Sequence, residues 1–178
     1  LLQSSAASDV YKRQIYEGTT AIQANDLVFR KTIRDNGAAV NSLLDDIDNE
    51  MATLANHHNT EIVKASKSII EANNTARKVA AHILGGANTP RRPAASGSNY
   101  LMLLGTLCGG WLMTRSGAAA ADALAKGETG AIGNDDFMKI KLTTMQIYIT
   151  HHLPKISGLA CTITDGDNPV LAMQPEWL

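Results

Sequence analysis

The chain has 178 residues and a formal net charge of -1, and only 4% of its residues are aromatic. This length suits one domain or a piece of a larger protein, and a charge this close to zero gives no strong field to attract nucleic acid. The longest apolar run, Leu101 to Met113, is interrupted by polar and glycine residues and is too short to span a bilayer comfortably. We therefore expect no nucleic-acid partner and no membrane span.

The beginning of the chain differs in character from the helical remainder. Residues 1–14 are small and polar without a sustained period, and we expect them to be disordered or a non-native start. A helix is predicted from Ala21 to Asp35, because Thr20 and Gln23 fit a capping box at its start. The pair Asn36-Gly37 is a stop signal at its end.

The next two helices are predicted by apolar residues at helical spacing. The first has the stripe Val40, Leu43, Leu44, Ile47, Met51 and Leu54, and His57-His58-Asn59 breaks it. The second runs from about Thr60 to Leu84, with one face formed by Ile62, Ser66, Ile69, Ile70, Asn73, Ala76, Ala80 and Ile83. Gly85-Gly86 ends this second helix.

Prolines, glycine and serines predict a linker without helix from Ala87 to Ser98. A fourth helix, from about Asn99 to Ala125, is rich in glycine and alanine, and we expect it to be the most buried helix because small residues let backbones come close. Its Gly105-x-x-x-Gly109 spacing is interpreted as close packing between two soluble helices. Trp111 is interpreted as a core anchor of this helix.

The last third of the chain has two more helical segments. After a break at Gly127 to Gly133, a helix is predicted from Asp135 to about Leu153, with one side formed by Phe137, Ile140, Thr144, Ile147 and His151. Pro154 interrupts it, and a sixth segment groups Ile156, Leu159, Ala160 and Ile163. A turn at Thr164 to Pro169 and an extended tail are expected to come next. Since no run alternates with a two-residue period, the sequence predicts an all-α fold, an antiparallel helix bundle of about five to six helices.

Several polar clusters contain metal-ligand residue types. Adjacent helical residues point about 100° apart, so His57-His58 and His151-His152 are interpreted as structural histidines. Asp165-Gly166-Asp167-Asn168 lacks the downstream glutamate of a calcium loop and is interpreted as a plain turn. Cys108 and Cys161 have no CxxC spacing and are interpreted as reduced thiols of a cytoplasmic helical core. We expect no metal site.

The most informative stretch is Ile15-Tyr16-Glu17-Gly18-Thr19-Thr20-Ala21-Ile22-Gln23. It joins a carboxylate, a glycine, two hydroxyl groups and the start of an amphipathic helix. A carboxylate in a dry site has its pKa raised toward the working range of a base, and a following glycine lets ligands approach the backbone. From the residues alone, Glu17 is either a catalytic base or an exposed residue before an ordinary capped helix.

The pattern Ile-Tyr-Glu-Gly-Thr-x-x-Ile-Gln, followed by a helix that carries an arginine, resembles the signature loop of the flavin-dependent acyl-CoA dehydrogenases. The continuation Ala24 to Lys31 is similar to a bacterial branch with an extra C-terminal helical domain, which includes enzymes for 3-methylmercaptopropionyl-CoA. Tyr100 to Gly105, Gly109 to Leu112, and Lys141-Leu142 leading to His152-Leu153-Pro154 also resemble that domain.

The resemblance implies an FAD-dependent enzyme that oxidises an acyl-CoA thioester to a trans-2-enoyl-CoA. Glu17 is then the catalytic general base that takes the α-proton while flavin N5 accepts the β-hydride, and its backbone N–H helps bind the thioester carbonyl. Gly18 and Arg30 are implied to contact the acyl-CoA substrate. The residues implied to contact the FAD cofactor are Thr19, Thr20 and Ala21.

The resemblance also implies a division of the chain. Residues 15–36 would end the catalytic helical domain, and residues 37–178 would form the extra C-terminal helical domain. Because the flavin-binding core of the family would precede residue 15, we expect a C-terminal fragment that alone neither binds FAD tightly nor dehydrogenates acyl-CoA. The implied partners are an electron-transfer flavoprotein and a second copy in a homodimer, in the bacterial cytoplasm. An acyl-CoA oxidase and a non-catalytic helical interaction module remain alternatives.

Overall fold

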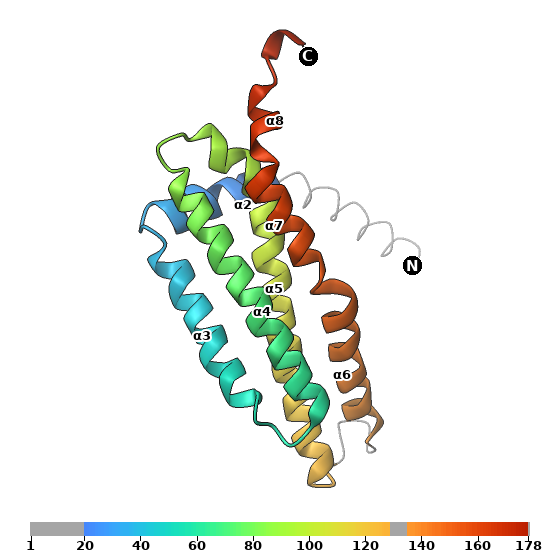
Figure 1. The fold of residues 1–178 in the computed structure, drawn as a ribbon. Coiled ribbons are helices and arrows are strands. Elements are labelled where there is room, and N and C mark those ends of the chain that lie inside the picture. Colours follow the sequence, from blue (N-terminus) through green and yellow to red (C-terminus); the bar gives the residue numbers. More distant parts are fainter. Residues whose placement is uncertain (1–19, 129–134, 178) are drawn as a thin grey trace, which may run out of the picture.

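The computed structural model describes residues 20–128 and 135–177 (Figure 1). Within these ranges the chain forms helices and no strand, which confirms the predicted all-α bundle. The five helices of eleven residues or more are α3 (Ala38–Leu54), α4 (Thr60–Gly85), α5 (Arg91–Ala125), α6 (Asp136–Ile147) and α7 (Lys155–Asp165). The shorter elements are α2 (Thr20–Asn25), the π-helices η1 (Asp26–Ile33) and η2 (Tyr148–His152), α8 (Asp167–Ala172) and the 3₁₀-helix η3 (Pro175–Trp177).

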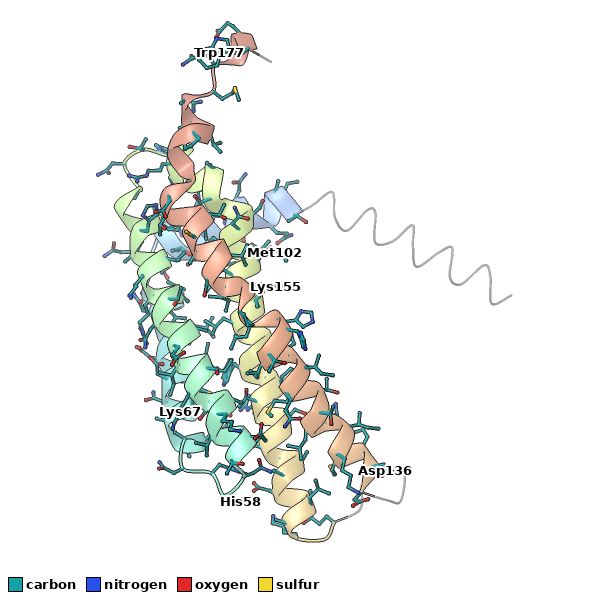
Figure 2. All side chains as sticks on the ribbon, turned by 45° about the vertical axis from the view of Figure 1, so that its right-hand side comes forward. His58, Lys67, Met102, Asp136, Lys155 and Trp177 are labelled. Carbon is teal, nitrogen blue, oxygen red and sulfur yellow. The ribbon has the colours of Figure 1, made fainter. Side chains whose placement is uncertain are left out.

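Helices α3, α4 and α5 alternate in direction, and α6 and α7 both run opposite to α5 (Figure 1). Helices α3 and α4 form an antiparallel hairpin on one side of α5, and α6 followed by α7 returns along its other side. Helix α2 crosses the end of the bundle where α5 begins. Helix α8 and η3 extend past that end, where Trp177 is exposed (Figure 2).

The main core joins one face from each of the helices α3, α4, α5 and α7. Its largest fully buried side chains are Leu44, Ile47, Met51, Ile69, Ile83, Tyr100, Leu103, Leu107 and Ile163. Burying a side chain of this size contributes about 1.5–3 kcal/mol to folding. A smaller cluster under α6 consists of Ile62, Ala65, Ala118, Ala121 and Met145.

The stripes predicted for the two central helices are confirmed. In α3, the side chains of Val40, Leu44, Ile47 and Met51 are buried, and those of Leu43 and Leu54 pack partly against the core. In α4, every residue of the predicted face is buried except the half-buried Ile70. The polar member Asn73 is fully buried, and its Nδ2 donates a hydrogen bond of 2.8 Å to the carbonyl of Leu44.

The predicted stop at Asn36-Gly37 is also confirmed. Both residues have a positive φ, 53° for Asn36 and 80° for Gly37, a region that asparagine tolerates and glycine favours. The carboxylate of Asp35 accepts hydrogen bonds from the backbone N–H groups of Gly37 and Ala39, at 3.1 and 2.9 Å. This turn ends η1 and starts α3.

The linker prediction is wrong for residues 91–98, because α5 already begins at Arg91. Pro93 occupies the third helical position, and a helix has no internal partner for its first four N–H groups, so a proline there costs no hydrogen bond. Gly97 is buried because α2 crosses it: a Cβ there would lie 3.5 Å from the Cβ of Ala24.

The end of the chain differs from its prediction as well. The expected turn at Thr164 to Pro169 is only a bend at Gly166, since α7 continues to Asp165 and α8 begins at Asp167. The tail expected to be extended contains α8 and η3. Proline at the third position of α8 is compatible with the first turn of a helix, for the same reason as Pro93.

Helix α6 has apolar residues on two sides. The side identified from its sequence faces solvent, with Ile140 exposed by 58% and Ile147 by 50%. The side that packs on the bundle is centred on Met145, which is 1% exposed, with Leu142 and Ile149 partly buried beside it. Periodicity alone does not decide between two apolar sides of one helix.

Three glycines of α5 allow close helix packing. A Cβ on Gly110 would lie 2.7 Å from Cδ1 of Ile69, and a Cβ on Gly117 would lie 2.6 Å from Sδ of Met145. Gly109 faces the hydroxyl of Tyr148. The contacts of α5 with α6 and α4 therefore depend on glycine at these positions. Of the predicted pair Gly105 and Gly109, Gly109 is at a close contact, whereas a Cβ on Gly105 would meet nothing within 4 Å, so the prediction is wrong for Gly105. Within the described ranges, no helix has both the length and the apolar content needed to cross a bilayer.

Candidate active site

The predicted catalytic loop lies mostly outside the described residues. Glu17, Gly18 and Thr19 precede them, whereas Thr20 and Ala21 form the first two positions of α2. Thr20 is half-buried and Ala21 is exposed. The helix begins one residue earlier than the capping box predicted, so that Thr20 is a helical residue. The last four residues of the loop motif, Thr20 to Gln23, are thus part of α2.

The helix after the loop is held firmly to α5. Ala24 is 2% exposed and Val28 is fully buried, and both pack over Gly97 of α5. The hydroxyl groups of Thr32 and Tyr100 form a buried hydrogen bond of 3.3 Å. Burial raises the pKa of the Tyr100 phenol, so this hydroxyl keeps its proton at neutral pH. The direction in which the chain enters the bundle is fixed by these contacts.

Residues 26–33 form a π-helix rather than an α-helix. At its end, the backbone N–H of Arg34 donates to the carbonyl of Phe29, 3.2 Å away and five residues earlier. The buried positions Ala24, Val28 and Thr32 are spaced by four residues. A helix with i→i+5 hydrogen bonds is wider than an α-helix and keeps positions of this spacing together on one face. The π-helical turns therefore keep Thr32 on the face that reaches Tyr100.

Arg30, the predicted substrate contact, is on the exposed side of η1. Its Nη1 lies 2.8 Å from Oδ1 of Asp26, and the arginine side chain is 70% exposed. An exposed ion pair between residues four apart contributes only about 0.3–0.5 kcal/mol, so little free energy opposes its release. Nothing in the fold requires Arg30 to keep Asp26 as its partner, and the guanidinium is accessible to a ligand.

One comparison decides the family. The family model described as "Acetyl-CoA dehydrogenase C-terminal like" matches residues 43–174, about three quarters of the chain. The chain belongs to the acyl-CoA dehydrogenase family, as a C-terminal segment. The family model begins inside α3 and covers α4 to α8, so it does not include the predicted loop.

Two relatives support the same family. The chain is 35% identical over 162 residues to the 3-methylmercaptopropionyl-CoA dehydrogenase of Ruegeria pomeroyi, covering 88% of this chain and 26% of that protein. It is 29% identical over 164 residues to the broad-specificity linear acyl-CoA dehydrogenase FadE5 of Mycobacterium tuberculosis, covering 89% of this chain and 26% of that protein. This acyl-CoA dehydrogenase segment thus spans about a quarter of the length of the relatives that it matches.

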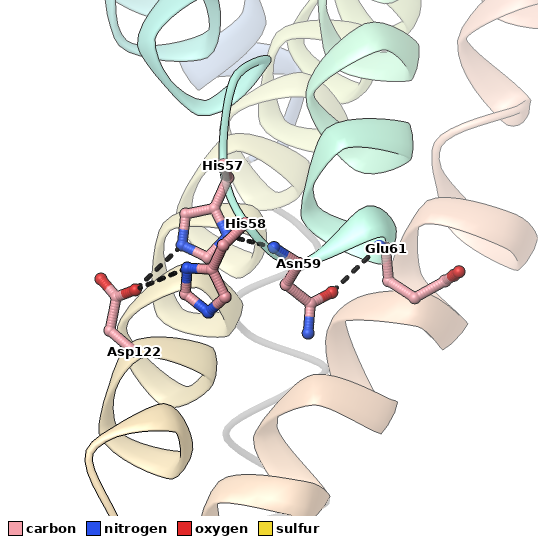
Figure 3. A network of polar contacts seen from close by, with 5 residues as sticks. All are labelled: His57, His58, Asn59, Glu61 and Asp122. Atoms are coloured by element: carbon pink, nitrogen blue, oxygen red, sulfur yellow. Dashed lines mark hydrogen bonds and ion pairs between the residues drawn. The ribbon is translucent and has the colours of Figure 1, made fainter.

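A second polar site lies where the α3–α4 connection meets the end of α5 (Figure 3). Nε2 of His57 lies 3.1 Å and Nδ1 of His58 lies 3.5 Å from the same carboxylate oxygen of Asp122. The two imidazole rings are 4.2 Å apart between centroids. These three side chains bring possible metal-ligand atoms within 4.8 Å of one another. Asp122 was not connected with the histidines from the sequence, because 65 residues separate it from His57.

The hydrogen bonds of His57 decide what this cluster does. The backbone N–H of Asn59 donates to Nδ1 of His57 at 3.1 Å, so a neutral His57 carries its proton on Nε2 and donates it to Asp122. A histidine that ligates a metal uses the opposite arrangement, with a free lone pair toward the metal and a donor on the other side. Asn59 in turn caps α4 by accepting a hydrogen bond from the N–H of Glu61. The cluster therefore fastens the loop to α5. Because His57 and His58 lie in this loop and not in a helix, the 100° separation expected between them does not apply, and their structural role stays a prediction.

A hollow of about 350 Å³ lies between α4 and the junction of η2 with α7. Its lining includes Ser68, Glu71, Thr75, Ile149 and Pro154. Of the predicted site residues, Thr20, Ala21 and Arg30 are described, and these three do not line it.

The structure also identifies supporting residues that the sequence did not indicate. Gly97 and Tyr100 anchor the helix after the loop, and Glu50 accepts a hydrogen bond of 2.7 Å from the indole N–H of Trp111. Trp111 is accordingly half-buried at the edge of the core, not a fully buried anchor. These partners are far apart in sequence, and no local pattern connects them.

Proposed function

We propose that this chain supplies the base-bearing loop and the helical C-terminal region of an FAD-dependent acyl-CoA dehydrogenase. The observation that carries the proposal is that the last four residues of the Ile15 to Gln23 motif belong to α2, a helix anchored on the domain that defines the family. A base on a loop needs a fixed support, because its carboxylate must be held close to the carbon that loses the proton. The buried contacts of Ala24, Val28 and Thr32 supply that support.

In the proposed reaction, Glu17 removes the proton from the carbon next to the thioester carbonyl of an acyl-CoA. The backbone N–H of the same residue donates a hydrogen bond to that carbonyl and stabilises the negative charge that develops on its oxygen. Gly18, without a side chain, leaves room for the acyl group at the backbone. Arg30, accessible on η1, binds the phosphate-bearing coenzyme A end.

The residues that the structure describes do not form a complete FAD site. Thr20 and Ala21 offer one hydroxyl and the first N–H groups of α2 at the surface, and an exposed helix end does not enclose an isoalloxazine ring. We therefore assign two roles to this chain. It removes the proton, and Thr19, Thr20 and Ala21 supply a small part of the contacts to the flavin. The rest of the cofactor contacts would come from the part of the protein that corresponds to the unmatched three quarters of its relatives.

The names of the two relatives suggest the substrate class. One acts on 3-methylmercaptopropionyl-CoA by its name, and the other on linear acyl-CoA thioesters. Both names describe unbranched acyl chains, so we propose an unbranched acyl-CoA, with 3-methylmercaptopropionyl-CoA as a candidate. Both are also named dehydrogenases, which favours an electron-transfer flavoprotein as electron acceptor over oxygen. A bacterial cytoplasmic homodimer is part of this proposal.

The test is Glu17→Gln in the full-length protein that contains this segment. The amide cannot accept the proton, so the rate of anaerobic flavin reduction by acyl-CoA should fall by about 10²–10⁴-fold while acyl-CoA binding persists. Glu71→Gln, an exposed glutamate on α4, is the matched control and should leave that rate unchanged. Turnover that survives in Glu17→Gln would remove the base assignment and favour a non-catalytic module. Hydrogen peroxide formed in proportion to product would identify an oxidase.

A further inference from the structure

The hollow of about 350 Å³ between α4 and the junction of η2 with α7 is lined by groups that accept hydrogen bonds. Helix α4 contributes Ser68, Glu71 and Thr75, and α7 contributes Ser157. Among the described residues, those that line the hollow include no lysine, arginine, histidine or side-chain amide. The polar side chains of the lining therefore supply a carboxylate and hydroxyl groups, but no cation.

The carboxylate of Glu71 pairs with no cation within the ranges that the structure describes. Lys67 lies one helical turn before it and Lys155 is the first residue of α7 (Figure 2), but neither forms an ion pair with it. The backbone carbonyl of Glu71 accepts a hydrogen bond of 3.1 Å from the hydroxyl of Thr75. Because this bond uses the only hydrogen of that hydroxyl, Oγ1 of Thr75 is left as an acceptor.

The carbonyl of Ile149, another residue of the lining, has no donor from its own helix. It would accept from Leu153 in an α-helix and from Pro154 in a π-helix. Leu153 donates instead to the carbonyl of Tyr148, at 3.0 Å, and proline has no N–H. Few partly buried carbonyls in proteins are without a partner, because such a group costs free energy. The π-helix η2 and the proline after it thus leave a backbone acceptor beside the hollow.

The buried part of the lining is apolar. Ala72, Leu153 and Ile156 line the hollow and belong to the main core. A ligand that matches both parts of the lining has a polar group with several hydrogen-bond donors and a short apolar body. A protonated primary amine has both features, because an ammonium group carries three N–H donors and no acceptor.

We propose that this hollow binds a small primary amine in its protonated form. The ammonium group donates to the carboxylate of Glu71, to Oγ1 of Thr75 and to the carbonyl of Ile149, and the alkyl part lies on the apolar side chains. An anion would be repelled by Glu71, and a neutral ligand would leave its charge without a partner. The proposal is independent of the proposed function, since the described residues of the acyl-CoA site do not line the hollow.

The test is a titration of the 178-residue chain with butylammonium chloride, followed by the NMR shifts of its backbone amides. The amides of Ser68, Thr75 and Ser157 should shift and saturate, with a dissociation constant in the millimolar range because the ligand has few atoms. Tetramethylammonium chloride is the matched ligand, with the same charge and no N–H donor, and should give no saturating shifts. A chain that binds neither cation, or both equally well, overturns the proposal.

Variants of the lining separate the hollow from the rest of the surface. Glu71→Gln removes the charged acceptor and should weaken butylammonium binding about tenfold. Ser68→Leu fills the hollow and should abolish binding. Asp46→Asn, which removes an exposed carboxylate from α3 outside the hollow, is the control and should leave the affinity unchanged. Wild-type affinity in Glu71→Gln contradicts the site. If Ser68→Leu loses its helix content by circular dichroism, Glu71→Gln decides, because its side chain is exposed.

Discussion

The hydroxyl of Tyr148 occupies the space that a side chain on Gly109 would need. The same hydroxyl donates to the carbonyl of Thr106, one turn earlier in α5. Tyr148 is the first residue of the π-helix η2, which follows α6 directly. A single aromatic side chain thus connects the end of α6 to the middle of α5, and it does so only because Gly109 has no Cβ.

Gly109→Ala should therefore destabilise the fold. The added methyl group overlaps the Tyr148 hydroxyl and forces either the ring or the helix to move, and overpacking of this kind costs about 1–3 kcal/mol. The free energy of unfolding in urea measures the effect. Gly158→Ala, at an open helical site, is the control and should stabilise by about 0.5–1 kcal/mol. Equal effects of the two substitutions would show that the Tyr148 contact is not tight.

Asn73→Ala should be one of the most destabilising changes of a polar residue in α4. Asn73 is fully buried, and its Nδ2 donates to the carbonyl of Leu44 in α3. Loss of this hydrogen bond inside the core should cost about 1–3 kcal/mol, read from the urea midpoint. Thr75→Ala, which removes only an exposed hydroxyl bonded to Glu71 of its own helix, should change stability little. Similar midpoints for the two variants would contradict the role of Asn73.

Stability should decrease at alkaline pH through Tyr100. Burial raises the pKa of its phenol above the ordinary value of 10.0. Above pH 10.0 the unfolded chain therefore loses this proton while the folded chain keeps it, so the unfolded state binds fewer protons and the free energy of unfolding falls as pH rises. The stability that the protonated Tyr100 contributes is fully present below the pKa of Tyr100 in the unfolded chain, and it is lost as the pH rises through the pKa of Tyr100 in the folded chain.

The variant Tyr100→Phe isolates this effect. It removes the titrating group and the hydrogen bond to Thr32, which should lower stability at pH 7 by about 0.5–1.5 kcal/mol. The difference between wild type and variant should then shrink as the pH rises above 10.0. Urea unfolding at a series of pH values measures both the loss of stability at pH 7 and the change of that difference with pH. Parallel pH curves for the two proteins would mean that the phenol is not desolvated.

Zinc should not stabilise the cluster of His57, His58 and Asp122. Nδ1 of His57 already accepts a hydrogen bond from Asn59, so its Nε2 carries a proton and offers no lone pair to a metal ion. A ligand that binds only the folded state raises the melting temperature, so melting with zinc and with a chelator should give the same value. His58→Ala controls for weak binding by the exposed ring. A zinc-dependent rise that disappears in His57→Ala would establish a metal site.

Local patterns predicted the helices well and their partners poorly. The stripe from Val40 to Leu54 and the stop at Asn36-Gly37 depend on neighbours within a few turns, and both are confirmed. The start of α5 at Arg91 was missed because proline signals a break in most contexts and is harmless only in the first helical turn. The sequence also did not predict which side of α6 faces the bundle. Ile140 and Met145 are both apolar, and only the fold shows that Met145 is buried and Ile140 is exposed.

The candidate site also has a part that local sequence predicted and a part that it did not. The loop motif with Glu17 is contiguous in the sequence and was recognised there, and it stays a prediction because it precedes the described residues. The groups that hold its helix, Gly97 and Tyr100, come from another part of the chain and were not recognised. Nor was the link between His57 and Asp122. Contacts over such sequence distances leave no periodic signal in a single sequence.

The bond between Thr32 and Tyr100, which spans 68 residues, has a consequence for biosynthesis. While the chain leaves the ribosome, Ala24 cannot pack on Gly97 and the hydroxyl of Thr32 cannot bond to Tyr100 until this part of α5 has emerged. The α3–α4 hairpin forms from nearby residues and can assemble earlier. Helix α2, which follows the loop motif, is therefore synthesised early but docks late. It completes its packing only after the α3–α4 hairpin can form. A translational pause before residue 100 would leave the loop without its support.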